Sequence, residues 1–309
     1  MEAEGPAVVR AAAGQALSRR EFGGVAEAGL MSLSRRPVHR SGGEGGSLGE
    51  GGQSASTVTI GVQSYSFRDR SLTEAITGMQ KLGLRSCELW QAHVEPRGLP
   101  REELRRWRET VPLDTFHRVR DQFAKASIAL SAYNISIQDG FSDAEIERAF
   151  EMTAALGAPV ITSSSNIATV ARIAPVAERR RMLVGMHNHS RVDPNEFATA
   201  KSLADAMQKN RYIAANLDIG HFTATNEDAV AFLTEHHDRI VTLHLKDRKR
   251  NQGPNLEFGA GDSPVAEVLK LVSANRWPIP MNIEYEYKGG DSVDEVGKCL
   301  AYCRRVLNL

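Results

Sequence analysis

The chain has only three cysteines among its 309 residues, Cys87, Cys299 and Cys303, and no two of them form a CxxC pair. So low and odd a count argues against a disulfide scaffold, although it is compatible with export. Positive and negative side chains balance at 38 each, which argues against electrostatic capture of nucleic acid. No apolar run reaches the roughly 18 residues that a membrane span needs. What remains is an ordinary globular composition, 41% hydrophobic and 25% charged.

Residues 1–57 differ from the rest of the chain because Gly, Ser, Ala and Arg dominate them. Such a composition buries too little apolar surface to offset the entropy of ordering, so we predict a disordered segment. Within it, Ser18-Arg19-Arg20-Glu21-Phe22 resembles a twin-arginine export signal, followed by an apolar stretch at 23–33 and small residues at 54–56. We therefore expect a periplasmic or otherwise exported protein. The alternative is a disordered basic tail on a cytoplasmic protein.

From residue 57 onward, short apolar runs alternate with stretches whose apolar residues recur at helical spacing. Strands are predicted at 58–63, 86–90, 128–133, 159–163, 183–189, 213–218, 240–246 and 280–286. Helices are predicted at 72–82, 143–156, 168–179, 197–209, 227–236 and 263–274. Eight strand-helix units in about 250 residues predict a single-domain (β/α)8 TIM barrel over residues 58–309. The alternative, an open doubly wound sheet, is disfavoured because no Gly-x-Gly-x-x-Gly follows the first strand.

Three local signals mark the ends of these elements. Gly83 and Gly157 each follow a predicted helix and precede a predicted strand, as C-terminal stops should. Asp143 and the pair Asp262-Ser263 are predicted to be N-caps. The run Gly259-Ala260-Gly261-Asp262 permits a phosphate cradle, but a tight turn is favoured because the lysine of a P-loop is missing.

Polar side chains end four of the predicted strands, in the segments 186–189, 216–221, 243–247 and 283–286. Alternate residues of a strand share a face, and a TIM barrel carries its active site at the C-terminal ends of its strands. We therefore predict that each segment supplies one ligand to a divalent metal: His187, Asp218, His244 and Glu284. His189 is the alternative to His187 as a ligand. The alternative to a metal site as a whole is that the histidines are ordinary core residues and that Asp218 caps a helix or forms a salt bridge. The expected ion is Mn²⁺, with Co²⁺, Zn²⁺ or Mg²⁺ as alternatives.

Five further residues are predicted to surround the metal and take part in catalysis: Glu88, His189, His221, Lys246 and Glu286. A lysine beside a cation binds substrate oxygens or an enolate. Glu286, His189 or Glu88 would then carry the proton. For each of these residues, a salt bridge without a catalytic role is the alternative.

These segments, together with Ile60–Ser66 and Cys87-Glu88-Leu89, resemble the sugar phosphate isomerase/epimerase family of the xylose isomerase-like TIM barrel superfamily. The resemblance covers residues 58–309. It implies that Asp218, His244 and Glu284 are metal ligands, and that His187 stands where the family has a Glu that doubles as an acid or base. It also implies proton abstraction next to a carbonyl, through a metal-stabilised enediolate, on a sugar, keto-sugar or keto-glycoside. The outcome would be isomerisation, epimerisation or elimination.

Two other functions stay open on the same barrel. A metal-dependent hydrolase, including the endonuclease IV branch, is disfavoured because a nuclease would want a basic groove. A non-catalytic sugar-binding protein is disfavoured because the ligand set is intact. The expected partner is a small carbohydrate, with no nucleic acid and no membrane span, and a homo-oligomer is left open. Four aromatic residues near the expected mouth would stack on a sugar ring or serve packing alone: Tyr65, Phe67, Trp90 and Tyr285.

Overall fold

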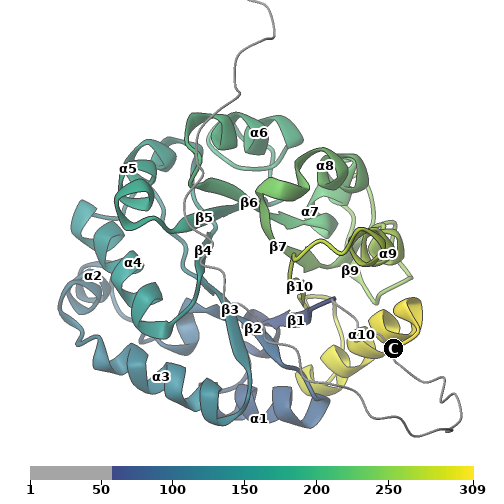
Figure 1. Ribbon diagram of the computed structural model, residues 1–309, viewed down its shortest axis with the longest axis horizontal. Coiled ribbons are helices and arrows are strands. Elements are labelled where there is room, and N and C mark those ends of the chain that lie inside the picture. The colour runs from purple at the N-terminus through teal and green to yellow at the C-terminus, as the bar shows by residue number, and fades with distance from the viewer. Residues whose placement is uncertain (1–57) are drawn as a thin grey trace, which may run out of the picture. The chain divides into compact units, whose positions relative to one another are not determined.

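Eight parallel strands close into a barrel in the computed structural model, which describes residues 58–309 (Figure 1). The strands are β1 (Ile60–Gln63), β2 (Ser86–Trp90), β3 (Ala129–Asn134), β4 (Val160–Ser163), β5 (Leu183–His187), β6 (Ile213–Asp218), β7 (Ile240–Leu245) and β10 (Met281–Ile283). Closure comes from the pairing of β1 with β10, in which Ile60 lies opposite Met281. The predicted TIM barrel is therefore confirmed, and the open sheet is wrong. The predictions for residues 1–57, disorder and an export signal, lie outside the described residues.

Helices surround the barrel and bury its outer face (Figure 1). They are α1 (Leu72–Leu82), α2 (Arg101–Thr110), α3 (Asp114–Lys125), α4 (Asp143–Leu156), α5 (Val170–Arg180), α6 (Ala200–Lys209), α7 (Ile219–Ala224), α8 (Ala229–His236), α9 (Val265–Asn275) and α10 (Ser292–Leu307). A two-stranded hairpin of β8 (Asp247–Arg248) and β9 (Asn255–Leu256) follows β7. Among the described helices, none combines the length and apolarity needed to cross a bilayer.

Local capping explains why several helix bounds match the sequence prediction. Gly83 and Gly157 end α1 and α4 in the left-handed conformation, with φ of 72° and 69°, as predicted. The N-cap of α4, however, is Ser142 rather than Asp143, because the Ser142 side chain accepts from the Glu145 amide in a capping box. The prediction for Asp262-Ser263 is also wrong, because α9 begins at Val265 behind Pro264.

The strands are shorter than the apolar runs that predicted them. β5 ends at His187, β7 at Leu245 and β10 at Ile283, so the last polar residues of each run lie on the loops above the strands. His189, Lys246, Glu284 and Glu286 therefore belong to the C-terminal face of the barrel, where its active site is expected.

Candidate metal centre and catalytic pocket

The four predicted ligands stand at the C-terminal ends of four strands that are neighbours in the barrel, in the order β5, β6, β7 and β10, with Glu284 directly after β10. The register places Asp218 of β6 directly opposite His244 of β7. Each ligand residue offers one nitrogen or oxygen atom, and the four atoms all lie within 4.8 Å of one another. All four residues are buried, with exposures between 0% and 8%. The structure thus brings together the full set that the sequence predicted: His187, Asp218, His244 and Glu284.

Each of these residues buries one polar atom that has no hydrogen-bond partner in the described part of the chain: His187 Nδ1, Asp218 Oδ2, His244 Nδ1 and Glu284 Oε2. His244 Nδ1 lies 3.0 Å from Glu284 Oε2, close enough for an ion pair but without hydrogen-bond geometry. Asp218 Oδ2 and Glu284 Oε2 also lie within ion-pair distance of the Lys246 ammonium. His187 Nδ1 is therefore the one of the four atoms for which no partner is found in the described part of the chain. Two imidazole nitrogens and two carboxylate oxygens are a donor set that fits a divalent transition-metal ion with room for substrate.

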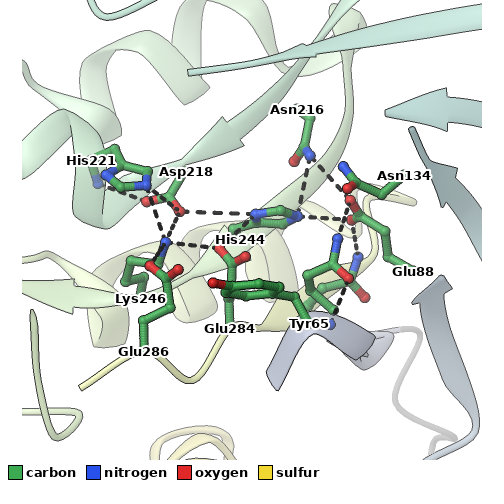
Figure 2. Close-up of polar contacts among 12 residues, drawn as sticks. Tyr65, Glu88, Asn134, Asn216, Asp218, His221, His244, Lys246, Glu284 and Glu286 are labelled. Atoms are coloured by element: carbon green, nitrogen blue, oxygen red, sulfur yellow. Dashed lines mark hydrogen bonds and ion pairs between the residues drawn. The ribbon is translucent and has the colours of Figure 1, made fainter. Parts of the chain in front are cut away.

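Lys246 places a buried cation beside this set (Figure 2). Its ammonium nitrogen lies 3.0 Å from Asp218 Oδ2, 2.9 Å from Glu284 Oε2 and 2.6 Å from Glu286 Oε2. Burial alone would lower the pKa of Lys246, but the three carboxylates outweigh it and raise that pKa well above its usual value. Lys246 is therefore a charged donor at neutral pH and is unsuited to act as a base.

The two oxygens of Asp218 have separate partners. Oδ1 accepts from the His221 amide at 2.7 Å and so caps α7, while Oδ2 faces the ligand set. The side chain of Asn188 holds the Asp218 backbone in place, accepting from its amide and donating to its carbonyl oxygen at 2.9 and 3.0 Å. Burial raises the pKa of Asp218 to about 6, against the opposing attraction of Lys246. A divalent ion at Oδ2, added to the charge of Lys246, would keep this carboxylate ionised.

Glu88, which the sequence made a candidate to carry the proton, lies beneath the four predicted ligands and does not line the cavity. Its carboxylate is fully buried and accepts from His244 Nε2 at 2.9 Å (Figure 2). Four other side chains from around the barrel donate to the same carboxylate: Gln63, Thr162, Asn216 and Asn282. Burial would lower the pKa of His244, but Glu88 and Glu284 together raise it well above its usual value.

These four amide and hydroxyl partners of Glu88 are residues that sequence reasoning missed. Their only signal was a polar residue inside an apolar strand, such as Asn216 between Ala215 and Leu217. Gly61 leaves room for one of these partners, Asn282, because a Cβ at position 61 would lie 2.3 Å from Asn282 Oδ1.

Two further histidines, His189 and His221, line the pocket above His187. The ring centroids of His187 and His189 are 4.8 Å apart, and those of His189 and His221 are 5.4 Å apart. His221 lies between two cations, with Nε2 3.2 Å from Lys246 Nζ and Nδ1 2.9 Å from a guanidinium nitrogen of Arg248. Burial, followed by the charge of Lys246, lowers the pKa of both His189 and His221, so both rings are neutral near pH 7. Arg248 was missed, although it continues the alternation of His244 and Lys246.

A cavity of about 260 Å³ opens over the ligand set. Its other side is lined by Tyr65, Trp90, Asn134, Ser136 and Ser164. The rings of Tyr65 and Trp90 meet edge to face with centroids 4.9 Å apart, and both offer an aromatic surface to a ligand. Phe67 and Tyr285, the other two aromatic candidates, are buried in the core.

The glycine-rich run after β9 binds a side chain of the protein itself. Asp247 Oδ2 accepts from the amides of Gly259 and Gly261 at 2.7 and 3.0 Å, and Oδ1 accepts from the amide of Ser263 at 3.1 Å. The amides that a phosphate would need are occupied, so this run is a tight turn.

Residues 79–305 match the model of the xylose isomerase-like TIM barrel family. The chain belongs to this family. No curated protein matches its sequence.

Solved structures share the barrel at low identity. A protein from Parabacteroides distasonis ATCC 8503 is 22% identical with a TM-score of 0.60, covering 81% of this chain and 99% of its own. A 3-keto-D-glucoside 4-epimerase from E. coli is 14% identical with a TM-score of 0.61, and the match covers 80% of this chain and 99% of the epimerase. A D-allulose 3-epimerase from Methylomonas sp. is 12% identical with a TM-score of 0.62, covering 81% and 98%. These likenesses establish a common fold.

Proposed function

We propose that the chain is a divalent-metal-dependent isomerase, epimerase or lyase that abstracts a proton next to a carbonyl on a sugar, keto-sugar or keto-glycoside. The observation that carries this proposal is the convergence of four buried nitrogen and oxygen atoms from the ends of four neighbouring strands, all within 4.8 Å of one another beneath an open cavity. Two solved structures of the same fold, a 3-keto-D-glucoside 4-epimerase and a D-allulose 3-epimerase, support the substrate class.

The ion would be held by His187, Asp218, His244 and Glu284. It would supply a Lewis acid that polarises the carbonyl and a neighbouring hydroxyl and so acidifies the C–H bond of the hydroxyl-bearing carbon next to the carbonyl. Manganese is the ion we favour. Within this centre Glu88 positions the ring of His244 by accepting from Nε2, so that Nδ1 would give up its proton and offer its lone pair to the ion.

The side chains above the ligands would handle the proton and the developing charge. Lys246 is a charged donor that can hydrogen-bond to an enediolate oxygen. Glu286 lines the cavity beside Lys246 and is our first candidate to hold the abstracted proton. His189, also in the cavity wall and neutral near pH 7, is the second.

The imidazole at His187 changes the charge of the centre. With Asp218 and Glu284 as the two anionic ligands, a divalent ion leaves the ligand set formally neutral. A third carboxylate in place of His187 would make it negative. The centre with His187 therefore holds one negative charge fewer than a centre with a carboxylate at that position. An enediolate that develops in the cavity beside Lys246 is repelled less, which favours its formation.

The test is hydrogen exchange at carbon. The full chain is loaded with Mn²⁺ and incubated in D₂O with ketoses, 3-keto-D-glucose and 3-keto-D-glucosides, and deuterium incorporation is followed by NMR. We expect exchange in at least one sugar, lost in Asp218→Ala and His244→Ala. The control is Asp205→Ala, because Asp205 pairs with Lys201 on the surface and should leave exchange unchanged. A folded, metal-loaded protein that exchanges no sugar would refute the proposal, and the products would separate isomerisation from elimination.

A further inference from the structure

A second hollow opens next to the cavity over the ligand set. It measures about 470 Å³ and is lined by Gln138, Ser164, Asn166, His189, Arg191 and Glu196. Ser164 and His189 also line the first cavity, so the two spaces share a wall. At that wall Ser164 Oγ and His189 Nε2 are 3.5 Å apart. These two side chains therefore separate the two spaces, and a ligand that occupies both would lie across them.

Three loops of the C-terminal face build this hollow, and hydrogen bonds tie them together. Asn195, on the loop after β5, donates from its side chain to Asp139 on the loop after β3 at 2.9 Å. The Asn195 side chain also accepts from the amide of Ala168, beyond β4, at 2.9 Å. Asn166 and Glu196 add an isolated antiparallel bridge. The hollow is thus preformed by contacts within the chain, as a ligand site usually is.

The wall of the hollow is polar and carries no net charge. Arg191 and Glu196, its two charged residues, form an ion pair with each other. The side chain of Gln138 is exposed and makes no hydrogen bond within the described residues, and Asn166 uses its side-chain oxygen to accept from the Asp139 amide. Amide donors and acceptors of this kind match hydroxyl groups. A phosphate would want an uncompensated cation, and an aryl group would want an aromatic wall; this lining has neither.

Size leads to the same conclusion. Ligand pockets usually measure about 300–1,000 Å³. The cavity over the ligand set, at about 260 Å³, is below that range by itself, whereas the adjoining hollow alone lies within it.

We infer that the second hollow is a subsite for a sugar ring attached by a glycosidic bond to the reacting keto-sugar. The substrate is then a glycoside or disaccharide whose keto-sugar ring lies over the metal ligands and whose second ring lies against Gln138 and the Arg191–Glu196 pair. This inference rests on the proposed function and narrows its substrate class.

The test compares a free keto-sugar with its glucosides, using the Mn²⁺-loaded full chain and the same exchange assay. The free sugar is chosen as the one that exchanges fastest in the first assay. If that sugar is D-fructose, the glucosides are turanose, maltulose, leucrose and palatinose, which differ in the fructose hydroxyl that carries the glucose. We expect at least one glucoside to exceed the free sugar in kcat/KM by about tenfold, equal to about 1.4 kcal/mol.

Variants then locate the gain. Gln138→Ala should remove most of it and Gln138→Trp should abolish it by filling the hollow, while both leave exchange of the free sugar unchanged. Gln80→Trp is the matched control, since Gln80 is exposed on α1. The inference fails, with the proposed function intact, if the free sugar exchanges and every glucoside is equal or slower, or if the gain survives in Gln138→Trp. If neither free sugars nor glucosides exchange, the proposed function itself fails and the subsite with it.

Discussion

Replacing Glu88 with Gln tests whether this carboxylate positions His244 or carries a proton. The substitution keeps the shape but removes the charge, and it turns one acceptor oxygen into an NH₂ donor. Glu88 Oε2 now accepts from His244 Nε2 and from Asn282 Nδ2, both at 2.9 Å. The side-chain amide at position 88 has two orientations in the variant. Either its NH₂ group faces the two donors His244 and Asn282, or it faces the donors that now bind Glu88 Oε1. In the first case His244 loses the acceptor that fixes its ring and tautomer, and in the second it keeps only an uncharged and therefore weaker acceptor.

The expected loss follows from the contact. A hydrogen bond to a charged group contributes about 1.5–3 kcal/mol, and carboxylate partners of metal-binding histidines typically change metal affinity by about 10–100-fold. We therefore expect Glu88→Gln to weaken Mn²⁺ binding about 10–100-fold in a competition titration against a fluorescent chelator. Excess Mn²⁺ should restore most of kcat, because Glu88 does not line the cavity. Glu235→Gln is the control, since that side chain is 77% exposed.

Two results would refute this reasoning. A folded Glu88→Gln variant with wild-type Mn²⁺ affinity would show that Glu88 does not position the ligand. A variant whose kcat stays low at saturating Mn²⁺ would instead favour the proton-shuttle interpretation of Glu88. Near-ultraviolet circular dichroism of each variant establishes that the core is intact.

Three further predictions address other parts of the account. Asp218→Asn should lose the metal, as measured by mass spectrometry of the purified protein. The variant should keep the cap of α7 and a wild-type circular dichroism spectrum, because the amide oxygen can still accept from the His221 amide. Retained metal would contradict the ligand assignment. Lys246→Met should keep or tighten metal binding, because the variant removes the ammonium group that competes with the metal for the carboxylates. The kcat of exchange should fall about 100- to 1,000-fold. An unchanged kcat would exclude Lys246 from the reaction. Glu145→Gln should cost about 3 kcal/mol in urea unfolding at pH 7. Burial acts to raise the pKa of Glu145, but hydrogen bonds from Arg101, the Ser142 amide and Arg108 outweigh it and lower that pKa. The stabilisation is therefore present above the unfolded pKa of about 4.3 and is lost as pH falls through the folded value. A difference from wild type that persists at pH 2 would contradict this.

The sequence predicts best where the determinants are local. The α1 and α4 bounds match the predicted helices because a capping Ser, a Glu three residues later and a terminal Gly all lie within one segment. The barrel follows from the number and spacing of apolar runs. Between β2 and β3, by contrast, the helices α2 and α3 were not predicted, since α2 is rich in Arg and Glu and has few apolar residues to mark a periodicity.

The candidate site divides in the same way. The convergence of the four ligand residues is predictable because all end strands at one face of the barrel. The environment of Glu88 is not, since its partners come from β1, β4, β6, β7 and β10 and depend on how far each side chain reaches across the barrel. The position of Lys246 among three carboxylates likewise needs the packed structure, because alternation along β7 gives only the face.

The metal centre itself is tested most directly by the metal-to-chain ratio of the 309-residue chain after Mn²⁺ loading and desalting, measured by mass spectrometry for wild type and for single Ala variants at each predicted ligand. The account predicts one ion per chain in wild type and its loss in the variants of His187, Asp218, His244 and Glu284, with Asp205→Ala retaining it. An ion that stays bound in folded Asp218→Ala and His244→Ala, or a wild-type protein that binds none, would contradict the account.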